Sequence, residues 1–362
     1  MTVFNRRPAL RWLVPLLAVI LFAAGGSAVG VITAAARGGL PHRSASALLV
    51  DVQKARLDGL SGTIVQNAEL GLPSLPGVGG GGSSDLSSMV AGSHTLRLWY
   101  AGPDHVRLAL LGSLGESDVV RNGTDLWTWA SSTRSATHHA VPASAHDATG
   151  SPLPASPMTP QQAADAALKA ITPTTRVSTG GTAVVAGRPA YELVLEPRDS
   201  GSLVGSVRTA IDGATHIPTR VQVFAEGASK PALEVGFTSF DPTRPSGSVF
   251  RFNPPPGTKV TQSPSLPSGA RPQMPSGKAA GVRPTIVGSG WTTVAVAPVP
   301  SGALSGSATV SRVLRVLPKV SGTWGSGRLL RGTLFSALLT DDGRVAIGAV
   351  APDRLYTALA GR

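Results

Sequence analysis

The sequence predicts an α+β protein: an N-terminal membrane helix, a curved antiparallel half-barrel sheet covered by helices, and a small α+β domain at the C-terminus. Residues 184–252 show apolar side chains such as Tyr191 and Leu193 alternating with polar ones, between frequent turn sequences. This pattern is typical of consecutive antiparallel strands. Helical patterns at 44–57 and 159–171 precede these strands. A curved sheet leaves one apolar side to be covered, and the helices are the available cover.

Residues 1–37 are predicted to be a signal peptide or a membrane anchor. Arg6, Arg7 and Arg11 precede an uncharged run at 12–36, which is long enough as a helix to cross a hydrocarbon core of roughly 30 Å. Positive charge before the run favours export of the rest of the chain. Small residues near its end leave cleavage open, whereas its full length favours a retained transmembrane helix.

Residues 44–257 are predicted to form the main domain. Its first helix can be capped by Ser44, and its strands are separated by turns such as Asn122-Gly123, a frequent hairpin dipeptide. The second helix begins at Thr159, with proline at its first position. The strands are expected to continue to Phe252.

Residues 258–285 are rich in proline, serine and glycine and are predicted to be a linker. Residues 286–362 are predicted to be the small basic domain. Its expected elements are strands at 291–297, 328–340 and 344–350 and helices at 307–317 and 352–359.

Composition limits the chemistry of the chain. There is no cysteine, so disulfides and thiolate metal sites are excluded. No nucleophile elbow, zinc-protease motif or phosphate-binding loop is present, and we expect neither catalysis nor a cofactor nor a metal site. The net charge of +12 behind an export signal favours anionic lipid head groups or wall polymers over nucleic acid, although a basic surface without a specific partner stays open.

An ordered set of short motifs carries a family resemblance. They are Tyr100-Ala-Gly-Pro-Asp-His-Val-Arg, Asn122-Gly-Thr-Asp-Leu-Trp, Gly187-Arg-Pro-Ala-Tyr-Glu-Leu, Ile211-Asp-Gly to Pro218-Thr-Arg, and Phe250-Arg-Phe to Pro256-Gly. With them the chain resembles the LolA/LolB lipoprotein-carrier and RseB-like superfamily, in particular its membrane-attached actinobacterial members. The resemblance spans about residues 44–257. It implies an unclosed, curved sheet with an apolar cavity for acyl chains, and RseB-like members add a second domain and regulate an envelope stress sigma-factor pathway.

Six apolar side chains are the candidates for lining that cavity. Trp127 and Trp129 share a face of one predicted strand, and large aromatic rings can contact an acyl chain. Ordinary core packing is the alternative for each ring. The full candidate set is Leu96, Leu98, Val106, Leu108, Trp127 and Trp129.

The predicted function is non-catalytic: binding of a lipid or an acylated ligand by an exported envelope protein, for carriage or sensing. The alternative is an RseB-like regulator of a sigma/anti-sigma pathway that binds a membrane partner protein. In both cases the chain is expected at the cell membrane, with its main domains on the extracytoplasmic side. The ligand itself does not follow from the sequence.

Overall fold

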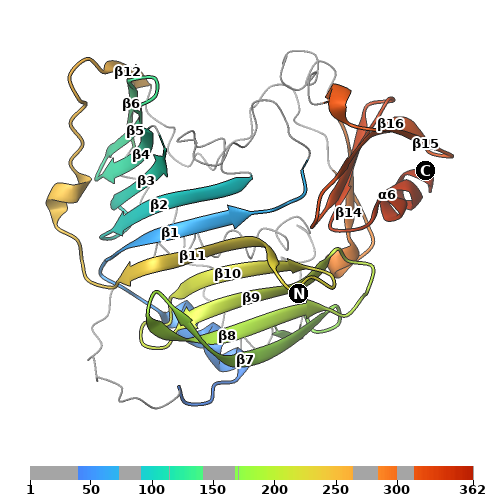
Figure 1. Ribbon diagram of the computed structural model, residues 1–362, viewed down its shortest axis with the longest axis horizontal. Coiled ribbons are helices and arrows are strands. Elements are labelled where there is room, and N and C mark those ends of the chain that lie inside the picture. Colours follow the sequence, from blue (N-terminus) through green and yellow to red (C-terminus); the bar gives the residue numbers. More distant parts are fainter. Residues whose placement is uncertain are drawn as a thin grey trace.

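The computed structural model describes residues 40–72, 91–113, 115–141, 168–169, 171–263, 284–299 and 314–361. These residues form two β-sheets, one of 12 strands and one of 6 (Figure 1). The helices predicted at 159–171 and 307–317 lie mostly outside them, and the membrane helix predicted within residues 1–37 lies outside them entirely. Among the helices that are described, none combines the length and the apolar character needed to span a membrane.

The large sheet is open and has the strand order β12-β6-β5-β4-β3-β2-β1-β11-β10-β9-β8-β7. Its neighbouring strands are antiparallel except β12 and β6, which are parallel. The sheet therefore consists of two series of consecutive strands, joined where β1 pairs with β11. The strands are β1 (Leu60–Ala68), β2 (Gly92–Tyr100), β3 (His105–Gly112), β4 (Gly115–Asn122), β5 (Asp125–Ala130), β6 (Ser135–Ala140), β7 (Thr175–Val185), β8 (Arg188–Pro197), β9 (Val204–Asp212), β10 (Pro218–Ala225), β11 (Pro231–Asp241) and β12 (Lys259–Ser263).

Helix α2 (Ala45–Lys54) confirms the first predicted helix and covers part of the large sheet. Its N-cap is Ser44, whose side chain accepts a hydrogen bond from the backbone N–H of Ala47 at 3.2 Å. Leu48 and Val52 are buried, and they pack in one cluster with side chains from β8 and β9, namely Tyr191, Leu193 and Ile211. Burial of this helical stripe holds α2 on the sheet.

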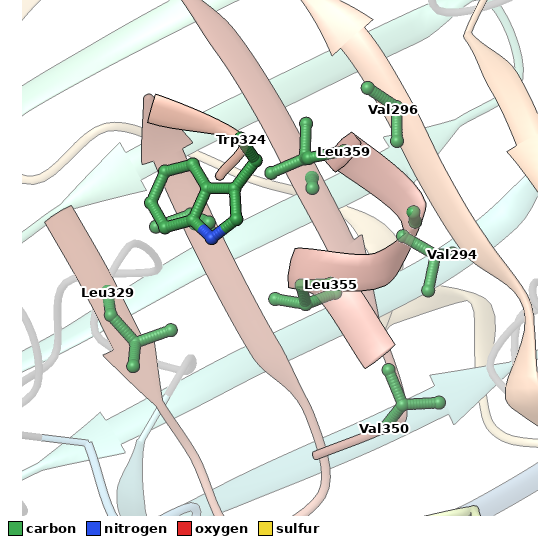
Figure 2. Packing of buried hydrophobic residues seen from close by; sticks show 10 residues of the cluster. Val294, Val296, Trp324, Leu329, Val350, Leu355 and Leu359 are labelled. Atoms are coloured by element: carbon green, nitrogen blue, oxygen red, sulfur yellow. The ribbon is translucent and has the colours of Figure 1, made fainter. Parts of the chain in front are cut away.

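The small sheet has the order β13-β14-β18-β17-β16-β15 and is covered by a C-terminal helix. Figure 2 shows Leu355 and Leu359 of that helix beside Val294 and Val296 of the sheet, in one buried cluster. Trp324 closes the cluster and stacks on Tyr356, with ring centroids 5.4 Å apart. The elements are β13 (Thr285–Val287), η3 (Gly290–Thr292), β14 (Val294–Pro298), β15 (Lys319–Gly322), β16 (Gly325–Arg331), β17 (Ser336–Thr340), β18 (Arg344–Gly348) and α6 (Pro352–Ala360).

The prediction of one long strand at 328–340 is wrong. The structure has two strands there, β16 and β17, which pair with each other as a hairpin. The residues between them leave the sheet because they bind a segment next to the large sheet: the Thr333 backbone N–H donates to the Leu70 carbonyl at 2.7 Å. Contact with a distant part of the chain, which alternation does not reveal, interrupts the strand.

The predicted end of the main sheet at Phe252 is also wrong. After β11 the chain forms a short 3-10 helix, η2 (Gly247–Phe250), and continues to β12, which pairs with β6 at the far edge of the sheet. β12 lies within the range predicted as a linker, and the division into two units at 258–285 stays a prediction. Below, the small sheet with α6 is called the C-terminal unit.

Candidate functional site

The first surface of interest is the side of the large sheet that carries Leu96, Leu98, Val106 and Leu108, which we call the leucine face. Residues directly opposite each other in neighbouring antiparallel strands point to the same side of a sheet. Leu98 lies opposite Leu108, Val106 lies opposite Tyr100, and Leu96 is two residues from Leu98 on the same strand. These four predicted candidates therefore share one face.

The leucine face continues across β1 into the second series of strands. Ile64 of β1 lies opposite Leu96 on one side and opposite Phe237 of β11 on the other. Along β11, Leu233 lies opposite Val223 of β10. The pairing of β10 with β9 and of β9 with β8 continues the surface in the same way. The face thus runs from β3 to β8 and is mainly apolar, with Gln66 of β1 and Thr209 of β9 as polar residues on it.

The opposite side of the sheet, which we call the tryptophan face, carries Trp99, Trp127 and Trp129. Trp99 lies opposite Arg107, which lies opposite Val120, and Val120 lies opposite Trp127. Trp129 follows two residues after Trp127 and shares its side. The predicted candidates Trp127 and Trp129 are therefore not brought together with Leu96, Leu98, Val106 and Leu108.

The division has a simple physical cause. Alternation within a strand shows which residues share a side, but the turn decides how two strands are paired. The short turn after β4, with Gly123 at a φ of 65°, pairs Asn122 with Asp125 and thereby sets Trp127 opposite Val120. Asn122-Gly123 is confirmed as a hairpin turn, yet the strand register that followed from it was not predicted.

The leucine face is covered unevenly by the described residues. Over β8 and β9 it is covered by α2, and over β9 to β11 it packs against Leu334 and Trp291 of the C-terminal unit. Over β1 to β3 its centre, around Leu98, Val106 and Leu108, is only partly buried. Leu96 is buried beside them, with 5% of its surface exposed. The partly exposed centre is the candidate site.

The tryptophan face, by contrast, is crossed by residues 247–252, which we call the strap. Phe250 is 1% exposed and meets the ring of His105 edge to face, with centroids 5.6 Å apart. The Phe252 ring lies 5.4 Å from the Trp127 ring and 6.3 Å from the Trp129 ring. These two tryptophans therefore serve to hold the strap, which favours the packing interpretation of both rings.

An ion pair between Arg107, which is partly exposed, and the buried carboxylate of Asp118 lies beneath the strap. The Arg107 guanidinium donates from Nη2 to Asp118 Oδ2 at 2.5 Å and from Nη1 to the Val249 carbonyl at 3.5 Å. Asp118 is 1% exposed. A buried carboxylate depends on such a partner, because an uncompensated charge in the interior is strongly unfavourable. Arg107 thus links the sheet to the strap.

His138 holds β12, the strand that follows the strap in the chain, to the sheet. Its Nδ1 lies 2.8 Å from Gln262 Oε1 of β12, and its Nε2 lies 2.7 Å from Asp125 Oδ1 of β5. The ring also stacks on Trp127, with centroids 4.4 Å apart. Two acceptors suit an imidazolium, which donates from both nitrogens. The hydrogen bond to Gln262, with a smaller contribution from Asp125, raises the pKa of His138 above its ordinary value although partial desolvation lowers it.

We expect the hydrogen bonds of His138 to Gln262 and Asp125 to make the stability of the folded chain depend on pH. Because the folded pKa of His138 is raised, its contribution is fully present below the unfolded pKa of about 6.5 and is lost as the pH rises through the folded value. The free energy of unfolding should therefore fall as the pH rises from about 6.5 through the raised pKa of the folded state. Urea unfolding across that range, for the native chain and His138→Gln, measures the effect. An equally steep fall in His138→Gln would contradict the assignment to this residue.

The described residues of the two faces also bear on a possible metal site. Among the described residues, no group of three or more histidine, aspartate or glutamate side chains is placed to hold a metal ion. The residues that sequence reasoning missed are Phe250 and Phe252 as strap residues and Trp291 and Leu334 as cover. The sequence shows that these residues are apolar. It does not show which residues they contact, because those residues are distant in the chain.

Comparison with known proteins gives solved structures only, since no family model and no curated protein matches the chain. MucB in the Pseudomonas aeruginosa MucA/MucB complex is 16% identical, with 86% of this chain and 94% of that chain covered and a TM-score of 0.39. An uncharacterized conserved protein from Thermus thermophilus is 13% identical, with 60% and 97% covered and a TM-score of 0.33. A LolA superfamily protein from Nitrosomonas europaea is 9% identical, with 58% and 99% covered and a TM-score of 0.22.

One of these neighbours is described as a LolA superfamily protein. All of the quoted TM-scores are below 0.5, so the architecture stands on the strand order and register described above. The actinobacterial type is not addressed by the comparisons quoted and stays a prediction.

Proposed function

We propose that the chain is an extracytoplasmic, non-catalytic binding protein that takes up an acyl chain on the centre of its leucine face. The observation that carries the proposal is the group Leu98, Val106 and Leu108, which stays partly exposed on the leucine face next to the buried side chains Leu96 and Leu110. Exposed apolar surface of this kind, bounded by buried neighbours, is typical of ligand or partner sites. The resemblance to lipoprotein carriers favours an acylated ligand.

The proposed contact needs no charged partner for the acyl chain. Ile64, Leu96 and Phe237 extend the same surface across three strands, so an extended hydrocarbon chain can lie across it and bury its methylene groups. Each buried methylene contributes about 0.8 kcal/mol. Chain length would then determine affinity, and the head group would remain at the rim.

The second candidate is an RseB-like regulator that binds a membrane partner protein on the same side of the membrane. One observation favours it: a second, smaller unit is docked against the main sheet, as the family resemblance implies for RseB-like members. The two candidates differ in what occupies the leucine face. A carrier or sensor retains lipid, whereas a regulator of this type retains its protein partner.

The test is native mass spectrometry of the purified chain, followed by titration with a dansyl-labelled fatty acid. We expect co-purified lipid and saturable binding. Leu108→Gln places an amide on the leucine face and should weaken binding by roughly 10-fold, the effect of losing about one to two kcal/mol of apolar contact.

Trp99→Gln is the matched control, because Trp99 is next to Leu98 on β2, is also partly exposed, and points to the other side of the sheet. It should bind the fatty acid as the native chain does. Equal weakening by Leu108→Gln and Trp99→Gln, or no binding by the native chain, would reject the leucine face as the acyl site.

A further inference from the structure

We infer that the C-terminal unit is a detachable cover of the leucine face, so that docking of this unit and binding of an acyl chain compete. The inference rests on the proposed function and concerns the regulation of the same site. It follows from where the unit makes its contacts, from how those contacts are built, and from the continuity of the apolar surface below them.

The apolar contacts of the unit fall on the leucine face. Leu334, in the turn between β16 and β17, is 8% exposed and lies in one cluster with Val207 of β9. Trp291 packs against that cluster, as do leucine-face residues of β10 and β11, namely Val221, Val223 and Leu233. These side chains are part of the surface that continues through Phe237 and Ile64 to Leu96.

The polar contacts of the described residues lie around this apolar patch, and they include the Thr333 N–H donating to the Leu70 carbonyl at 2.7 Å and the Thr292 hydroxyl donating to Asp199 Oδ2 at 3.4 Å. Ser202 and Val350 form an isolated antiparallel bridge, with the Leu203 N–H donating to the Ala349 carbonyl at 2.8 Å. On another side, Trp291 Nε1 donates to Thr175 Oγ1 at 2.8 Å. When the unit undocks, water can form hydrogen bonds with the same groups. Each of these hydrogen bonds therefore contributes little to the free energy of docking.

The ion pair at the edge of the contact between the two units contributes little to the free energy of docking. Arg354 Nη2 lies 3.9 Å from Asp199 Oδ1, and both side chains are about half exposed. An exposed pair at this distance is screened by solvent and contributes little to stability. The C-terminal unit also has its own buried core under α6, so it does not need the large sheet to bury Leu355 or Leu359.

Competition follows from these facts. Leu334 and Trp291 cover apolar side chains of the leucine face on strands next to the proposed site. An acyl chain bound at that site would also cover side chains of the leucine face. A ligand that extends from Phe237 along β11 reaches Leu233, which the docked unit covers. Ligand and cover then shift each other's equilibrium by the same factor, because the coupling is reciprocal.

A disulfide between the two units tests this directly, since the chain contains no cysteine of its own. Ser202→Cys/Val350→Cys replaces residues that are directly opposite in an antiparallel bridge, a spacing of about 4.5–5.5 Å between Cα atoms that a disulfide can join. Oxidised, the full-length variant is locked in the docked state. Binding of the dansyl-labelled fatty acid should be about 5- to 150-fold weaker than after reduction.

Leu334→Asp provides the opposite change and keeps the test independent of the disulfide. A carboxylate does not tolerate the buried position of Leu334, so the unit should undock and fatty-acid binding should become tighter than in the native chain. Weaker binding by Leu334→Asp would show that Leu334 is a wall of the site instead of a cover, and would overturn the inference.

The remaining outcomes separate the inference from the proposed function. If the oxidised and reduced disulfide variants bind equally well, the cover is wrong and the acyl site stands. If neither these variants nor the native chain binds the probe, the acyl site is wrong and the inference fails with it. Ser202→Cys and Val350→Cys alone, oxidised and reduced, control for each substitution.

Discussion

Replacing Arg107 by leucine is expected to lower the free energy of unfolding by roughly 3–5 kcal/mol, because the change leaves Asp118 as an uncompensated charge in the interior. Asp118 is 1% exposed and its Oδ2 lies 2.5 Å from Arg107 Nη2. The strap loses an anchor at the same time, since Arg107 also donates to the Val249 carbonyl. Urea unfolding followed by circular dichroism measures the change.

Two further variants show whether the buried charge is the cause. Arg107→Leu/Asp118→Leu removes both charges and should recover most of the loss, since a buried pair can often be replaced by apolar side chains at little cost. Arg176→Leu removes one partner of an exposed pair, Arg176–Glu196, and should change stability by at most about 1 kcal/mol. If Arg107→Leu is as mild as Arg176→Leu, Asp118 is not a buried charge.

Phe250→Ala should be comparably destabilising, at about 3–5 kcal/mol, through lost burial and the void left under the strap. Phe250 is 1% exposed and its ring packs on His105 of β3. Because the strap also covers Trp127 and Trp129, we expect their fluorescence to shift to longer wavelength in the folded variant. Equilibrium unfolding and tryptophan emission are the measurements.

Val184→Ala is the matched truncation for Phe250→Ala on the same sheet. Val184 lies on the edge strand β7 and is 69% exposed, so its loss should change stability by no more than about 0.5 kcal/mol. Fatty-acid binding should survive in both variants, because neither side chain lies on the exposed centre of the leucine face. Loss of binding in folded Phe250→Ala would place the acyl site on the tryptophan face instead.

Several elements could be predicted because their causes are local. Ser44 and the stripe at Leu48 and Val52 specify α2 through three- and four-residue spacings. Pro352 at the first turn specifies α6 in the same way. The alternation of Tyr191 and Leu193 specifies β8, whose partner strand follows directly in the chain. Hairpins of this kind pair strands that are neighbours in the chain.

The turn at Asp212-Gly213 was predicted less well, because side-chain hydrogen bonds give it a different conformation from the expected one. Asp212-Gly213 is typical of a two-residue hairpin turn, yet the loop is longer: Asp212 Oδ1 accepts from the backbone N–H groups of Ala214 and Thr215, and His216 adopts a φ of 57°. Arg188 donates to the same carboxylate, with its Nε 2.6 Å from Asp212 Oδ2. A partner 24 residues away thus helps to shape a local turn.

What the sequence determined by itself is the class of architecture: consecutive antiparallel strands, a covering helix and a second small α+β unit, together with the apolar character of Leu96, Leu98, Val106 and Leu108. Only the tertiary structure decided that Trp127 and Trp129 lie on the other face, under a strap, and that Leu334 and Trp291 cover the leucine face. The reason is physical. Alternation and capping depend on neighbours within a few residues, whereas strand register and the docking of distant segments depend on which surfaces meet when the whole chain has folded.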